Sequence, residues 1–159
     1  MNTETLKLDN EVVNNWVTNY IPHNDTQVII TILNGAKHVG NLLSNKYNIP
    51  QKFIHLKSYN NDNNQESIKL INKFPNISEK RLLVVDDIYD TGNTLQYTLN
   101  ELIKYTTVEH IDIYTVIKKQ RPGKLLNTYT PQRHGNPVKC SIGYSCTVPE
   151  TTWIKFPWE

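Results

Sequence analysis

The chain has 159 residues, a formal net charge of +2 and 38% hydrophobic residues, which suits one domain with its own core. Acidic and basic residues are interspersed, so no basic face indicates a nucleic-acid-binding protein. The apolar runs are too short for a membrane span, and the polar N-terminal sequence MNTETLKLDNE is unlike a signal peptide. We therefore expect a cytoplasmic protein.

Strands and helices alternate along the first part of the chain. Residues 9–20 place apolar side chains on one helical face, with Asp9 as N-cap. Residues 28–33, VIITIL, predict a buried strand, and the apolar positions that follow again have helical spacing. Residues 53–59 predict another strand, followed by a long polar loop. This alternation predicts an α/β fold whose mostly parallel sheet is covered on both faces.

The next segment, residues 82–95, has the sequence LLVVDDIYDTGNTL. Its apolar start predicts a buried strand that ends at Asp86 and Asp87. A tight turn over residues 90–94 then leads into a helix whose apolar positions are Leu95, Leu99, Leu102 and Ile103. The first N–H groups of a helix lack partners and carry partial positive charge, so this turn predicts an anion site.

The side chains of this turn indicate which anion fits. Gly92 lets the backbone approach a phosphate, and Thr91 and Thr94 can donate their hydroxyls. The pattern is neither a P-loop nor a GxGxxG fingerprint. Asp86 and Asp87 would repel a bare phosphate, but they suit a sugar phosphate whose ribose hydroxyls donate to them, with Mg2+ balancing the remaining charge.

The run VVDDIYDTGNT resembles the phosphoribosyl pyrophosphate (PRPP) signature of the type I phosphoribosyltransferases. The resemblance implies that family's fold, a central mostly parallel sheet flanked by helices with a small hood formed by the terminal segments. It implies a single domain over residues 1–159, with a core at about 28–120 and a C-terminal hood at about 121–159. Asp86 and Asp87 would then hold ribose and help to place Mg2+, directly or indirectly. The implied 5'-phosphate-binding residues are Asp90, Thr91, Gly92, Asn93 and Thr94.

Two further segments resemble the pyrophosphate-binding parts of the family. The turn after residues 28–33 matches the pyrophosphate loop, and Lys37 beside it is either a binding cation or a solvated lysine. The pattern S-Y-x-x-D-N matches the flexible loop that closes over substrates in xanthine-guanine phosphoribosyltransferases, although Gln65 stands near the position of an arginine in some relatives. The implied pyrophosphate-binding residues are Leu33, Asn34, Gly35, Lys37, Ser58 and Tyr59.

The C-terminal part supplies the implied base-binding residues. A predicted strand over residues 110–117 is followed by Lys118 and Lys119. In 6-oxopurine enzymes of the family a lysine here donates to the purine O6, a role that aligns with Lys118 or, after a one-residue shift, with Lys119. The final TTWIKFPWE resembles the hood, in which a Trp stacks on the base and the next residue contacts it through its backbone. The implied base-binding residues are Ile88, Lys118, Trp153 and Ile154.

The resemblance implies a purine salvage enzyme that transfers the 5-phosphoribosyl group from PRPP to guanine, xanthine or hypoxanthine. Asp90 would act as general acid or base at the purine N7, and the protein would be a homodimer or homotetramer. Two alternatives stay open: an enzyme for adenine or a pyrimidine, and a non-catalytic regulator that binds PRPP or nucleotides. Residues 121–146 carry no pattern that separates a subunit-contact loop from an added hairpin.

Overall fold

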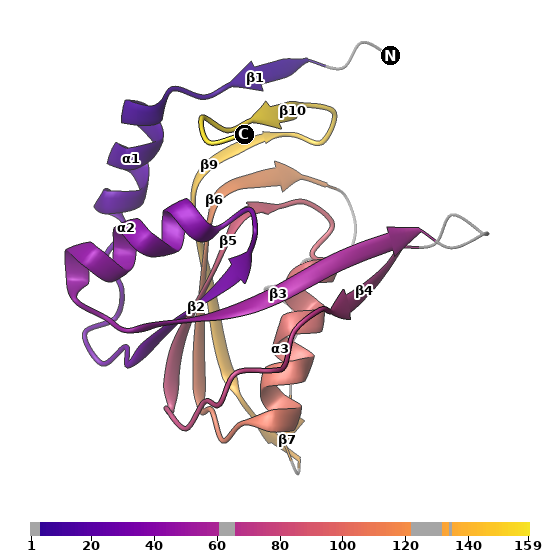
Figure 1. Cartoon of the computed structure of the whole chain (residues 1–159). Coiled ribbons are helices and arrows are strands. Elements are labelled where there is room, and N and C mark those ends of the chain that lie inside the picture. Colours follow the sequence, from indigo (N-terminus) through magenta and orange to yellow (C-terminus); the bar gives the residue numbers. More distant parts are fainter. Residues whose placement is uncertain (1–3, 61–65, 122–131, 134) are drawn as a thin grey trace.

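The main body of the protein is a six-stranded sheet with the strand order β4-β3-β2-β5-β6-β9. The computed structural model describes residues 4–60, 66–121, 132–133 and 135–159 (Figure 1). The strands are β2 (Val28–Leu33), β3 (Gln51–Asn60), β4 (Glu66–Leu70), β5 (Arg81–Tyr89), β6 (His110–Gln120) and β9 (Lys139–Pro149). Only the β3–β4 pair within this sheet is antiparallel. The expected mostly parallel sheet is confirmed.

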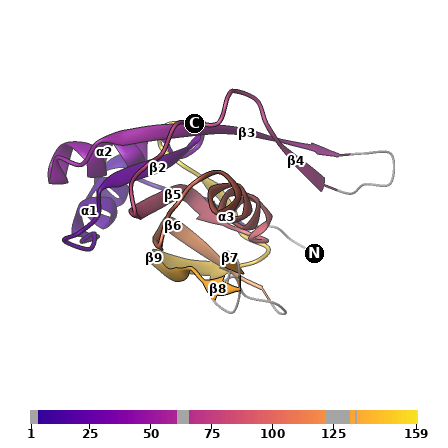
Figure 2. The same cartoon turned by 90° about the horizontal axis from the view of Figure 1, so that it is seen from below.

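Helices cover both faces of the sheet (Figure 2). Helices α1 (Asn10–Asn19) and α2 (Lys37–Tyr47) pack on one face, and α3 (Asn93–Tyr105) packs on the other. Successive strand residues point to opposite faces, so the apolar runs of β2 and β5 supply both layers. The layer under α1 and α2 includes Val13, Val17, Ile29, Val39, Leu43, Leu83 and Val85, and the layer under α3 includes Ile30, Leu82, Val84, Leu95, Leu99 and Leu102. None of the described helices is long and apolar enough to cross a membrane.

The two ends of the chain meet in a small separate sheet. β1 (Thr5–Lys7) pairs in parallel with β10 (Trp153–Lys155), next to the carboxyl ends of the main strands (Figure 1). This pair is the expected hood of terminal segments. The segment expected to form the hood, from about residue 121 onwards, also contains β9, which belongs to the main sheet and pairs with β6 along its whole length.

The sequence gives β9 little signal because it is an edge strand with mostly exposed or half-exposed side chains. It therefore lacks the continuous apolar run that identifies central parallel strands. β7 (Gln132–Arg133) and β8 (Asn136–Pro137) form a short antiparallel pair, which supports the added hairpin over a plain loop for that part of the segment.

Two strands run further than expected. β5 was expected to end at its acids, but its pairing with β6 continues through Asp86↔Thr115 to Tyr89↔Lys118. β6 likewise continues through both lysines to Gln120. The strand β4 was not expected at all, and it forms a hairpin with β3 whose connecting residues 61–65, with Gln65, lie outside the described residues. The acids of β5 are therefore held by strand pairing and not by a free loop.

Gly40 lets α2 pack closely on β2 and β3. A Cβ at this position would collide with Thr31 Oγ1 and Gln51 Oε1, which are hydrogen-bonded to each other at 2.6 Å. Gly40→Ala is therefore expected to lower the free energy of unfolding by about 1–3 kcal/mol, as overpacking does in cores. This loss is specific to the packed site, since replacing glycine by alanine in the exposed interior of a helix stabilises the helix by about 1 kcal/mol.

Urea unfolding of both proteins measures this difference. Asn45→Ala, an exposed position on the same helix, is the matched control and should stay within about 0.5 kcal/mol of the wild type. A Gly40→Ala protein as stable as the wild type would contradict the packing argument.

Candidate functional site

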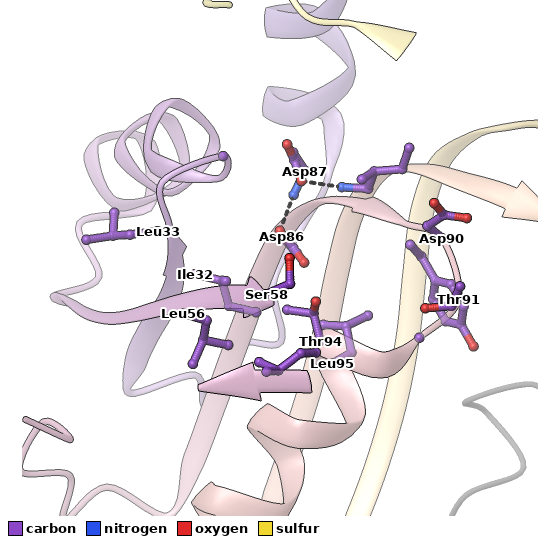
Figure 3. A pocket seen from close by; sticks show the side chains of 15 residues that line it. Ile32, Leu33, Leu56, Ser58, Asp86, Asp87, Asp90, Thr91, Thr94 and Leu95 are labelled. Carbon is purple, nitrogen blue, oxygen red and sulfur yellow. Dashed lines mark hydrogen bonds between the residues drawn. The ribbon is translucent and has the colours of Figure 1, made fainter. Parts of the chain in front are cut away.

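A cavity of about 340 Å³ lies at the carboxyl ends of β2, β3 and β5 (Figure 3). From β2 the chain proceeds through α2 to β3, whereas from β5 it proceeds through α3 to β6, on the opposite side. The cavity therefore lies at the point where the strand order reverses, which is where open α/β sheets bind their ligands.

The cavity brings together residues that the sequence places in three separate segments. The predicted site residues that line it are Leu33, Gly35, Ser58, Asp86, Asp87, Ile88, Asp90, Thr91, Gly92 and Thr94. Asn34, Lys37, Tyr59 and Asn93 neighbour these residues in the chain but do not line the cavity, and all four are exposed. Its apolar wall includes Leu56, Ile68 and Leu95, which were not among the predicted site residues.

Asp86 and Asp87 are adjacent acids of the cavity, the first buried and the second half-buried. Asp86 is only 8% exposed and its Oδ1 accepts the N–H of Asp87 at 2.9 Å. Asp87 Oδ1 accepts the N–H of Ile88 at 2.8 Å (Figure 3). Burial, together with the neighbouring Asp87 charge, raises the pKa of Asp86 well above its usual range, and burial also raises the pKa of Asp87. Neither acid has an ion-pair partner among the described residues.

The turn after β2 approaches one of these acids closely. The Leu33–Asn34 peptide bond is cis, and Gly35 follows it directly. A Cβ at Gly35 would lie 2.5 Å from Asp87 Oδ2, closer than atoms can approach. Only a glycine lets the backbone of this turn lie against the carboxylate.

The two helices that begin at the cavity have no side-chain N-cap. α3 begins after Gly92, which has φ of +87°, and α2 begins after Ala36. α1, which begins away from the cavity, is capped by Asp9 through Glu11 N–H and Val12 N–H. In the first turn of α3 the one side-chain contact to a backbone amide among the described residues is that of Asn93 N–H with Thr91 Oγ1, at 3.3 Å. The other amides of this turn are therefore open to an anion.

Asp90 makes ion pairs that the sequence did not predict. Arg121 donates to Asp90 Oδ1 from Nε at 2.6 Å and from a terminal nitrogen at 2.5 Å. Lys119 Nζ lies 3.7 Å from Asp90 Oδ2. Because successive side chains of a strand point to opposite faces, a β6 that includes both lysines places Lys118 and Lys119 on opposite faces of the sheet.

The predicted base-binding residues other than Ile88 lie outside the cavity lining. The Lys118 ammonium lies over the rings of Tyr89 and Tyr144, at 5.9 and 5.0 Å from their centroids. Trp153 is 62% exposed in the hood, where its backbone N–H donates to Glu4 O at 2.7 Å. Ile154 buries its side chain in the layer under α1 and α2. Their roles at a base stay predictions.

The donor set fits a hard divalent cation and hydroxyl groups together. The cavity is lined by three carboxylates, Asp86, Asp87 and Asp90, and by no lysine or arginine of the described residues. Carboxylate oxygens are the ligands that Mg2+ prefers, and it usually keeps waters and substrate oxygens in its shell. The described residues contain no cluster of three or more metal-ligating side chains, so a cation here would need such outside ligands.

Asp86 makes the stability of the fold depend on pH. The ordinary aspartate pKa is 3.8 and that of folded Asp86 is higher, so the folded state binds this proton more tightly. The resulting stabilisation is complete below the unfolded pKa and is lost as the pH rises through the raised pKa. Asp86→Asn removes the buried charge and keeps an acceptor for Asp87 N–H. It should raise the melting temperature at pH 7 by at least a few degrees, with a smaller gain at about pH 4.

Scanning calorimetry without divalent metal measures both gains. Asp25→Asn, at a side chain 80% exposed, is the control and should change neither temperature appreciably. An equal gain at both pH values, or none at pH 7, would show that Asp86 is not held as a costly buried charge.

Comparison with known proteins identifies similar sequences. A family model described as "Phosphoribosyl transferase domain" matches residues 8–159. The hypoxanthine-guanine phosphoribosyltransferase of Sus scrofa is 35% identical over 97 residues, which are 58% of this chain and 43% of that protein. The phosphoribosyltransferase domain-containing protein 1 of Xenopus laevis is 30% identical over 117 residues, 69% of this chain and 51% of that protein. The chain thus spans about half the length of the curated relatives it matches.

Solved structures share the fold over nearly all of the chain. A purine phosphoribosyltransferase from Pyrococcus horikoshii superposes with a TM-score of 0.74 at 24% identity, covering 98% of this chain and 94% of that one. The xanthine-guanine-hypoxanthine phosphoribosyltransferase of Helicobacter pylori gives 0.73 at 19% identity, with the same coverage of both chains. These likenesses confirm the expected fold, a central mostly parallel sheet flanked by helices.

Proposed function

The chain belongs to the phosphoribosyl transferase domain family, and we propose that it transfers the 5-phosphoribosyl group of PRPP to guanine, xanthine or hypoxanthine. The observation that carries this proposal is the pairing, in one cavity, of two adjacent carboxylates, one buried and one half-buried, with an uncapped helix N-terminus. A ligand that satisfies both must offer hydroxyl donors and an anionic group a short distance apart. A ribose 5-phosphate has this chemistry.

In the proposed complex the ribose hydroxyls donate to Asp86 and Asp87. The 5'-phosphate accepts from the backbone and hydroxyl donors of residues 91–94, which follow on the same turn. The pyrophosphate group lies towards Gly35 and Ser58, on the β2 and β3 side of the cavity. Mg2+ held beside Asp86 and Asp87 would neutralise the leaving pyrophosphate.

The proposed reaction breaks the bond between the anomeric carbon and pyrophosphate while a purine ring nitrogen bonds to that carbon. Positive charge develops on the ribose ring, so the site must exclude water that would otherwise react with it. Asp90 handles the purine proton as general acid or base. Lys118 would donate to the 6-oxo group and Trp153 would stack on the ring, which requires the hood to reach over the cavity. The residue Ile88 lines the cavity beside the acids.

The names of several relatives support a 6-oxopurine as acceptor. Hypoxanthine-guanine phosphoribosyltransferases of Sus scrofa and Homo sapiens match this chain over 97 residues at 35% and 34% identity. An enzyme that donates a hydrogen bond to O6 disfavours adenine, whose 6-amino group is itself a donor. The choice among guanine, xanthine and hypoxanthine depends on contacts at the 2-position.

A competition assay tests the function. The purified protein is incubated with PRPP, Mg2+ and a mixture of guanine, xanthine, hypoxanthine, adenine, uracil and orotate, and the nucleotides are separated by chromatography. We expect GMP, XMP or IMP with an equal amount of pyrophosphate, and no product when EDTA removes the metal. AMP, UMP or orotidine monophosphate as the main product would contradict the 6-oxopurine assignment, and PRPP binding without product would favour a regulator.

Asp90→Asn tests the catalytic assignment. Loss of a general acid or base typically costs a hundredfold or more, so we expect turnover to fall by roughly a hundredfold. Asp25→Asn, far from the cavity on an exposed loop, is the control and should keep full activity. Wild-type turnover in Asp90→Asn would remove this residue from the mechanism.

A further inference from the structure

Two cations hold Asp90 from outside the cavity lining. Arg121, the residue after β6, contacts Asp90 Oδ1 with two nitrogens at 2.6 and 2.5 Å. Lys119, whose side chain is only 10% exposed, lies 3.7 Å from Oδ2. Arg121 also lies 3.5 Å from Glu150 Oε2, near the end of β9. Both oxygens of the Asp90 carboxylate therefore face positive charge.

The proposed ligand makes this neutralisation necessary. Asp90 directly precedes the turn that would bind the 5'-phosphate, and it lines the same cavity as Asp86 and Asp87. No lysine or arginine in the described part of the chain lines this cavity. Like charges a few ångströms apart repel strongly where water is partly excluded. An unpaired Asp90 would therefore oppose a phosphate on the neighbouring amides.

We propose that Arg121 is a positioning residue that neutralises Asp90 and thereby allows a phosphate ester to bind on residues 91–94. In this role Arg121 does not contact the phosphate, and Lys119 assists it at longer range. The inference rests on the proposed function and deepens it, because it names the charge partner of one subsite.

Two other roles for Arg121 give different results on mutation. A surface ion pair contributes little, and Arg121 and Asp90 are 36% and 41% exposed. In that case replacing Arg121 would leave ligand binding unchanged. If Arg121 instead bound the phosphate directly, every variant without the arginine would bind the phosphate ester weakly, whatever residue stands at position 90. Only the neutralising role predicts that removal of the Asp90 charge restores binding.

Calorimetric titration with ribose 5-phosphate separates these roles. The proteins are the wild type, Arg121→Gln, Asp90→Asn and the double variant. We expect Arg121→Gln to weaken binding about tenfold or more, and Asp90→Asn to bind at least as tightly as the wild type. The double variant should return to within about threefold of the wild type. Arg121→Lys, which keeps the charge, should bind more tightly than Arg121→Gln.

Lys52→Gln is the matched control, because Lys52 forms an ion pair with Glu79 near the start of β3 and not at the cavity. It should bind ribose 5-phosphate as the wild type does. Unchanged binding by Arg121→Gln, or a double variant as weak as Arg121→Gln, would overturn this inference alone. A wild type that binds no ribose 5-phosphate would contradict the proposed function as well.

Discussion

The burial of Asp86 beside a second, half-buried carboxylate at the end of β5 is the constraint that governs this site. Asp86 and Asp87 have raised pKa values and no cation partner in the described parts of the chain. Buried charge of one sign costs free energy unless a ligand compensates it. β5 holds the acids in place by continuing its pairing with β6 beyond them. The fold thus maintains an arrangement that hydroxyl donors or a cation would stabilise.

The rest of the cavity follows from where the sheet places its loops. At the switch point the turn after β2 and the turn after β5 face each other, so Gly35 lies against Asp87 while Gly92 opens the start of α3. The helix away from this edge has a side-chain cap, whereas the two that begin here have none. Negative charge from the acids and exposed amides from the helices lie side by side. Asp90, which lies between the acids and these amides in the sequence, forms ion pairs with Lys119 and Arg121.

Much of this arrangement could be predicted from the sequence, because it depends on local patterns. The apolar run before Asp86, the small residues after Asp90 and the apolar spacing of α3 are all determined within a few residues. The cavity also required that the carboxyl ends of β2, β3 and β5 lie at one sheet edge, which the parallel-sheet rule supplies. The sequence was sufficient for these features.

The features that the sequence did not predict depend on pairing between distant segments. β9 contributes few buried side chains, so its place beside β6 has no apolar signature. Arg121 reaches Asp90 only because β6 extends past its lysines. The hood depends on β1 and β10, from opposite ends of the chain, forming one sheet. The roles predicted for Trp153 and Ile154 therefore rest on the resemblance to the family and not on the local sequence pattern.

A crystal structure of the protein with GMP and Mg2+ would show directly what the acids and the first turn of α3 bind. We expect the ribose hydroxyls to lie on the carboxylates of Asp86 and Asp87, with the 5'-phosphate on the amides of residues 91–94. A nucleotide bound elsewhere, or bound here with its phosphate away from these amides, would contradict this expectation.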